Sequence, residues 1–223
     1  MHRGGPRHGD GTAENVLKEM GGAYSIEGVI PIVHPTAFVH PDASLIGDVH
    51  IGAHCYIGPF ASLRGDMGRI EISEGTNVQD CCVLHCFPGR STFIDVDGHI
   101  GHGAVLHGCR IGPSVLIGIG AVIMDEVIVG ARSFVGAHSF VKSGMVVPDG
   151  WLVAGSPARQ VRQLTEVEMD WKANGTAIYQ ELAAHSLDSL RRVEPFAEVE
   201  PGRPSLAVGG TIARPLSEYC DTR

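Results

Sequence analysis

Aliphatic residues recur at every sixth position along most of this chain, and this period constrains its fold more than any other feature. A glycine often follows the aliphatic residue, and a small or β-branched residue often stands four positions after it. The period slips at Arg69, is lost from about 86 to 98, and shortens to five residues before Ile111. The aliphatic positions are Val39, Leu45, Ile51, Ile57, Leu63, Ile72, Val78, Leu84, Ile100, Leu106, Ile111, Ile117, Ile123, Val129, Val135, Val141 and Val147.

One short strand with one corner uses six residues, and three such sides close a triangular coil. Coils of this kind stack at the usual strand spacing of about 4.8 Å, with the aliphatic residue inside and glycine at corners of unusual backbone conformation. Hexapeptide periods are typical of parallel β-helices. We therefore predict a mainly β protein, a left-handed parallel β-helix with a C-terminal α-helix. A β-sandwich with regular turns is the alternative, and the near-strict register disfavours it.

The sequence divides into four segments. Residues 1–23 begin polar and glycine-rich and are predicted to form a flexible extension, and residues 24–155 form the β-helix. Residues 156–193 form a helical segment, and residues 194–223, rich in proline and glutamate, are predicted to be an extended tail.

Within the helical segment, Thr165 and Glu168 have the spacing of a capping box that opens a helix. We expect Gly175 to interrupt this helix and a second helical stretch to run from Thr176 to about Arg192. The side chains expected to form its buried stripe are Ile178, Leu182, Leu187 and Leu190.

Composition narrows the function classes. The formal net charge of −8 disfavours a nucleic-acid binder, which would neutralise phosphates with basic residues. No run of 18 apolar residues is present, so we expect no membrane span, and the first residues do not resemble a secretory signal. The six cysteines show no disulfide pattern of a small secreted domain and favour reduced thiols in the cytoplasm.

Several polar side chains are predicted to point out of the prism because they follow inward aliphatic residues along strands whose side chains alternate. Solvated surface residues are one interpretation of this set. A tetrahedral metal site with one open position is the other, and it would need a second prism to exclude water, hence a homo-oligomer. The set is His85, His102, His107, Arg64 and Gln79, with Asp66 and Asp80 close by.

The runs Arg64-Gly-Asp66, Asn77-Val-Gln-Asp80 and Gly101 to Cys109 together resemble the signature of the γ-class carbonic anhydrase family. That family is a homotrimer of left-handed β-helices with a metal on three histidines at each subunit interface. The resemblance implies that His85, His102 and His107 bind the metal, His102 coming from the adjacent subunit. Zn²⁺ is the implied ion, and imidazole ligands also suit Fe²⁺ and Co²⁺.

The same resemblance implies roles for four neighbouring residues. Arg64 and Asp66 would form a salt bridge at the interface beside the metal. Gln79 would orient the bound water, and Asp80 would support a ligand from behind.

A closer resemblance lies within that family, to the subgroup of phenylacetate-degradation (PaaY-type) and carnitine-operon (CaiE-type) proteins. It covers about residues 24–206 and is carried by the strings ASLRGDMGRI, GHIGHGAVLHGC and SFVKSGMVVPDGWLVAGSPAR and by the C-terminal RRVEPFAEVEPGRPSL. The PaaY type implies a metal-dependent thioesterase that hydrolyses acyl-CoA in phenylacetate catabolism. We therefore expect an enzyme with acyl-CoA as its substrate.

The chain also departs from the carbonic anhydrase pattern. Met67 stands where archaeal-type enzymes carry a carboxylate, and Asp95 and Asp97 in the segment from Phe87 to Gly98 do not align with a proton shuttle. Fast CO₂ hydration depends on proton export, so these departures favour a slower hydrolase. CO₂ or bicarbonate nevertheless remains an alternative substrate, and a hexapeptide acyltransferase and a non-catalytic assembly subunit are further alternatives.

A thiolate zinc site is a weaker interpretation of the cluster formed by Cys81, Cys82, His85 and Cys86. The register directs Cys82 and Cys86 inward and Cys81 outward, so these thiols should not converge. Cys82 and Cys109 are better explained as small residues that fill the core.

Overall fold

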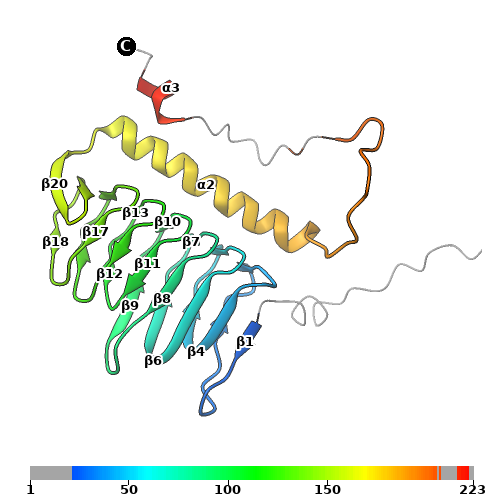
Figure 1. Ribbon diagram of the computed structural model, residues 1–223, viewed down its shortest axis with the longest axis horizontal. Coiled ribbons are helices and arrows are strands. Elements are labelled where there is room, and N and C mark those ends of the chain that lie inside the picture. The colour runs from blue at the N-terminus through cyan, green and yellow to red at the C-terminus, as the bar shows by residue number, and fades with distance from the viewer. Residues whose placement is uncertain (1–21, 205, 207–214, 221–223) are drawn as a thin grey trace, which may run out of the picture.

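The protein is a parallel β-helix, in agreement with the left-handed hexapeptide prism predicted from the sequence (Figure 1). The computed structural model describes residues 22–204, 206 and 215–220. The predicted extension therefore lies almost wholly outside the described residues. Among those described, no helix is long and apolar enough to cross a membrane.

Two sheets make up the sides of the prism. Nine strands of the larger sheet lie in the order β17-β14-β11-β8-β6-β9-β12-β15-β18, with β4 beside β6 and β1 and β2 beside β4. Its strands are β1 (Gly22–Tyr24), β2 (Ile32–Val33), β4 (Ser44–Ile51), β6 (Ser62–Ile72), β8 (Val83–His85), β9 (Ser91–Ile94), β11 (Val105–His107), β12 (Arg110–Ile111), β14 (Val122–Ile123), β15 (Ile128–Val129), β17 (Phe140–Val141) and β18 (Val146–Val147).

The smaller sheet has the order β20-β19-β16-β13-β10-β7-β5-β3 and forms the remaining side. All its pairings are parallel except that of β19 with β20, which is antiparallel. Its strands are β3 (Phe38–Val39), β5 (Tyr56–Ile57), β7 (Asn77–Val78), β10 (His99–Ile100), β13 (Leu116–Ile117), β16 (Phe134–Val135), β19 (Trp151–Gly155) and β20 (Ala158–Gln163).

The periodic aliphatic residues fill the interior of the prism. Equivalent residues of successive coils stack in register, as Leu84, Leu106 and Ile123 do in neighbouring strands, and all three are fully buried. Small residues such as Ala104 and Ala121 share the interior. Parallel pairing in register fixes which side chains point outward, because successive residues of a strand face opposite sides.

The segment from 86 to 98 is more regular than the sequence predicts. Strand β9 pairs with β6 and β12 and buries Ile94 in the core, so only about four residues before β9 leave the prism. The buried Thr92 hydroxyl donates to the His85 carbonyl at 2.6 Å and accepts from the Gly108 amide at 2.9 Å. Ile94 lies six positions before Ile100 but ten after Leu84, so the residues inserted before β9 interrupt the period and the strand itself resumes it.

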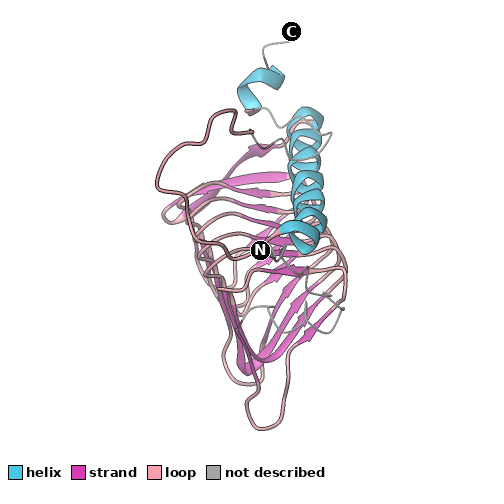
Figure 2. Ribbon diagram, turned by 90° about the vertical axis from the view of Figure 1, so that its right-hand side faces the viewer, coloured by secondary structure: helices cyan, strands magenta, loops and turns pink. Residues whose placement is uncertain are grey.

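Helix α2 (Glu166–Ser189) lies along one side of the prism and runs back toward its N-terminal coils (Figures 1 and 2). The predicted capping box of Thr165 and Glu168 is confirmed. The predicted interruption at Gly175 is wrong, because the helix continues through it and ends at Ser189. A glycine inside an exposed helix lowers helix stability by about 1 kcal/mol relative to alanine, and the contacts of α2 with the prism offset this loss.

The predicted apolar stripe of α2 is also wrong. The residues of α2 that are buried against the prism are polar or small: Glu168, Lys172, Thr176 and Ala183. The four residues predicted for the stripe, Ile178, Leu182, Leu187 and Leu190, are half-buried or exposed. The helix packs on polar corners of the coils, so the amphipathic pattern of its sequence did not identify the contacting side.

Two segments differ from the predicted organisation. Strand β20 lies in the segment predicted to be helical and pairs antiparallel with β19, which covers the C-terminal end of the prism. A short helix, α3 (Leu216–Cys220), lies in the segment predicted to be extended. Asn174 of α2 and Tyr219 of α3 are joined by a hydrogen bond of 3.4 Å.

Glu168 connects β20 to α2, because both of its carboxylate oxygens accept hydrogen bonds from Arg162, at 2.7 and 2.8 Å. These bonds lower the pKa of Glu168 from 4.5 to about 2. Glu168→Gln should therefore lower the free energy of unfolding by about 1–3 kcal/mol at neutral pH. Denaturant unfolding of both proteins measures the loss.

The pH dependence of this loss has a definite sign. A depressed carboxyl pKa stabilises the fold above pH 4.5, and this stabilisation disappears as the pH falls toward 2. The difference between the native protein and Glu168→Gln should shrink in the same range. Glu166→Gln, in the same helical turn but exposed, is the control, and an equal effect there would contradict the assigned role.

Candidate metal centre

His85 and His107 end neighbouring strands and face each other on the outside of the prism. They are register partners in β8 and β11, and Nδ1 of His85 lies 3.3 Å from Nε2 of His107. Their side chains are 12 % and 22 % exposed. The outward direction predicted for both histidines is therefore correct, and the fold brings them together although 22 positions separate them.

A carboxylate engages the far nitrogen of each imidazole. Nε2 of His85 lies 3.0 Å from Asp66 Oδ1, and Nδ1 of His107 lies 2.7 Å from Asp125 Oδ1. An ionised carboxylate only accepts hydrogen bonds, so each ring carries its proton on that far side. The two nitrogens at 3.3 Å then face each other with lone pairs, which repel unless a cation or a shared proton lies between them.

This geometry fits a metal ion. Zinc–nitrogen bonds of about 2.0–2.1 Å at the tetrahedral angle place two ligand nitrogens about 3.3–3.4 Å apart. Histidine ligands commonly donate their other N–H to a carboxylate, which orients the ring and strengthens the ligand. The pair of His85 and His107, with Asp66 and Asp125 behind it, has both properties.

His102 lies at the other end of strand β11, at the corner that joins β10 to β11. Nδ1 of His102 lies 2.6 Å from Asp80 Oδ2, so this ring also has a carboxylate on one nitrogen and leaves Nε2 available. Its side chain is 44 % exposed. Over the part of the chain that the structure describes, no cluster of three or more potential ligands is suited to hold a metal, so one subunit alone does not bring His102 to the pair.

Arg64 and Asp66 form an ion pair of 2.7 Å next to His85. Burial raises the pKa of the Asp66 carboxyl, but the hydrogen bonds with His85 and Arg64 lower it by more, so the net shift is downward. Asp66 is thus held ionised as the acceptor for the His85 ring.

Gln79 differs from the expectation of an open outer face. It points away from the core, yet it is 3 % exposed and belongs to a polar row with the buried Asn77 and the half-buried His99. Its Oε1 atom accepts from the backbone amide of His102 at 3.2 Å. Gln79 is therefore attached to the corner that carries His102.

The sequence predicted no site role for Asp125 or His99. Asp125 lies in the next coil, one position beyond the residue in register with His107, because Leu106 pairs with Ile123. An acidic residue about one coil after a histidine is the signal that could have identified it. His99 gave no such signal, because its burial depends on helix α2. The predicted directions of Cys81, Cys82 and Cys86 are correct: the last two are buried and the first is exposed.

A bacterial transferase hexapeptide (six repeats) model matches residues 31–65 and 108–143. The carnitine operon protein CaiE of Salmonella agona is 49 % identical over 194 residues, covering 87 % of this chain and 98 % of that protein. CaiE of Proteus sp. is 48 % identical over 195 residues, with the same shares. The chain therefore belongs to the hexapeptide-repeat family, in the group of the carnitine operon protein CaiE.

Two solved structures also resemble this one. A hexapeptide transferase family protein from Anaplasma phagocytophilum has a TM-score of 0.70 at 37 % identity and covers 74 % of this chain and 97 % of its own. A putative acetyltransferase from Bacillus cereus has a TM-score of 0.72 at 30 % identity, with shares of 74 % and 96 %. These likenesses support membership of a family of enzymes and leave the reaction to be decided by the site.

Asp125→Asn should weaken Zn²⁺ binding by the assembled protein about 10–100-fold, because an amide no longer fixes the protonation of the His107 ring. Equilibrium titration against a competing chelator measures this change. Glu126→Gln is the matched control, since Glu126 is the neighbouring residue and pairs with Arg90 at 3.3 Å on the surface. Equal affinities for the two variants would contradict the role of Asp125.

Proposed function

We propose that this protein is a metal-dependent thioesterase that hydrolyses acyl-CoA, with a site shared between neighbouring subunits of a homotrimer. His85 and His107 of one subunit and His102 of the next hold the ion, Zn²⁺ or alternatively Fe²⁺ or Co²⁺. The observation that carries the proposal is the 3.3 Å approach of two imidazole nitrogens whose far sides are engaged by carboxylates.

An apolar column beside the two histidines supports the shared arrangement. Val83, Val105, Val122 and Phe140 occupy equivalent outward positions in successive strands, and the first and last are 42 % and 37 % exposed. Aliphatic residues stacked on an outer face favour a packed protein surface over water. A second prism placed there would also exclude water from the metal.

The chemistry divides between the ion and the chain. A bound divalent ion supplies Lewis acidity and lowers the pKa of a water molecule to about 7. Asp66, Asp125 and Asp80 each accept a ring N–H and keep the histidines in the protonation state that binds a cation. Arg64 keeps Asp66 ionised and adds positive charge near the place where a carbonyl oxygen gains negative charge.

The surroundings of the pair favour an acyl substrate over CO₂. The Phe87 ring packs edge-on against His107 at 4.9 Å and is 57 % exposed, and Met67 is 48 % exposed. Apolar side chains can line the path of an acyl chain, whereas a proton shuttle needs titratable groups. Phenylacetate-type acyl groups, which the resemblance to PaaY-type proteins implies, are the first to test.

Acyl transfer is the second candidate, favoured by the transferase and acetyltransferase names of the two solved relatives. It needs an acceptor in place of water at the same thioester carbonyl. Release of free acid and free CoA without an acceptor distinguishes hydrolysis from transfer.

The decisive experiment is subunit complementation. His102→Ala and His107→Ala should each reduce thioester hydrolysis to background and lower the bound metal. Co-expressed, the two variants should regain activity, because roughly a quarter of interfaces in random trimers combine an intact pair with an intact His102. Activity is followed by thiol release from a panel of acyl-CoA esters.

Each part of the proposal has an outcome that contradicts it. Absence of recovery in the mixed trimer would contradict a shared site. Absence of metal in the purified native assembly would contradict the metal centre. Inert thioesters together with rapid CO₂ hydration would identify a carbonic anhydrase instead.

A further inference from the structure

A row of buried polar side chains lies between helix α2 and the sheet that carries β7 and β10. Asn77 and Gln79 are 0 % and 3 % exposed. The His99 ring packs edge-on against Tyr179 of α2, with ring centres 5.4 Å apart. Buried polar groups are costly unless they are hydrogen-bonded, so the bonding of this row determines its role.

The directions of three hydrogen bonds in the row follow from one backbone group. The His102 amide N–H can only donate, so the Gln79 atom that it meets at 3.2 Å is the oxygen. The Gln79 nitrogen then donates to Asn77 Oδ1 at 2.9 Å and to His99 Nε2 at 2.8 Å. Both hydrogens of the Gln79 amide are thereby used inside the subunit.

His99 must remain neutral in this row. Its Nε2 can accept from the Gln79 amide at 2.8 Å only if that nitrogen is unprotonated, so the ring carries its single proton on Nδ1, which lies 3.2 Å from the Asn77 amide nitrogen. An imidazolium would instead direct a second N–H at the Gln79 nitrogen. Burial lowers the pKa of His99 to about 3, and the positive charge of Lys172 lowers it further. A neutral ring here fixes the orientation of the Gln79 amide over the whole physiological pH range.

The corner that carries His102 depends on this amide. Gly101 and Gly103 donate their backbone N–H groups to Ile117 and Asp80 carbonyls, whereas the His102 N–H meets a side chain. A Cβ on Gly101 would lie 2.8 Å from the Ile117 oxygen, so the corner is close-packed on that side, and Gly103 has φ of +68°, a conformation that favours glycine. Gln79 is therefore the anchor at the centre of the corner.

We infer that His99 and Gln79 are positioning residues: His99, held under helix α2 by Tyr179, orients Gln79, and Gln79 holds the His102 corner in place for the neighbouring subunit. This orienting role goes beyond the proposed function. Only its expected consequence for metal binding rests on that function.

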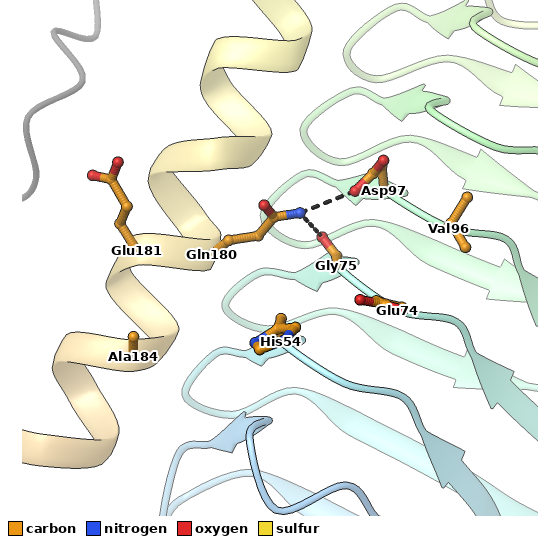
Figure 3. A pocket seen from close by; sticks show the side chains of 8 residues that line it. All are labelled: His54, Glu74, Gly75, Val96, Asp97, Gln180, Glu181 and Ala184. Carbon is orange, nitrogen blue, oxygen red and sulfur yellow. Dashed lines mark hydrogen bonds between the residues drawn. The ribbon is translucent and has the colours of Figure 1, made fainter.

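The test compares three variants. Gln79→Met removes the anchor at similar volume, and His99→Phe keeps a ring against Tyr179 but removes the acceptor. Gln180→Leu is the matched control: Gln180 donates to Gly75 O at 3.1 Å and Asp97 Oδ1 at 2.9 Å, which ties α2 to the prism away from His102 (Figure 3). These two bonds border an open pocket of about 610 Å³ that contains none of the predicted site residues.

Hydrogen exchange of the His102 backbone amide in metal-free protein is the first measurement, normalised to the Gly118 amide in the next coil. We expect at least tenfold faster exchange in Gln79→Met, a smaller acceleration in His99→Phe, and no change in Gln180→Leu. Unchanged exchange in Gln79→Met, or an equal effect in Gln180→Leu, would overturn the inference.

Zn²⁺ affinity of the assembled protein is the second measurement. We expect about 10–100-fold weaker binding in Gln79→Met and His99→Phe and native affinity in Gln180→Leu, because supporting residues behind a ligand typically have effects of this size. Altered exchange with no metal binding even in the native protein would overturn the proposed function and still support the anchored corner. Native affinity in both test variants would overturn the link to the metal site.

Discussion

The register of parallel coils is the constraint on which the rest of this structure depends. Each inward aliphatic residue packs on its equivalents in the coils above and below, and a shift of one position would place polar side chains in the core. Because the inside is fixed in this way, the outside is fixed too, and residues one coil apart form columns. The pair of His85 and His107 and the bond from His107 to Asp125 are direct products of this stacking.

The chemistry of the candidate site depends on carboxylates as much as on histidines. Asp66, Asp80 and Asp125 each engage one ring nitrogen, which leaves the other nitrogen as a lone pair. One subunit brings two of these lone pairs together and presents the third at an exposed corner. Under the proposed function, a single chain would contribute a pair of ligands to one site and a separate third ligand to the next.

Helix α2 does more than cover the prism. Its buried residues include Lys172 and Thr176, and its Tyr179 closes the polar row of Asn77, Gln79 and His99. This row reaches the backbone of His102 through one hydrogen bond. The C-terminal helix and the corner that presents the third histidine are therefore parts of one packed unit.

The sequence by itself determined the β-helix and the outward direction of the three histidines, because a six-residue period and strand alternation are local patterns that repeat many times. It also gave the capping box of Thr165 and Glu168, whose signal lies within one helical turn. Only the tertiary structure decided that β9 continues the coil, that α2 runs through Gly175, and that Gln79 is buried. Each of these depends on a partner distant in sequence: Thr92 on Gly108, Gly175 on the prism, and Gln79 on His99 beneath Tyr179. Local sequence patterns indicate which face of an element is apolar, whereas the role of a polar side chain depends on the groups that the fold places around it.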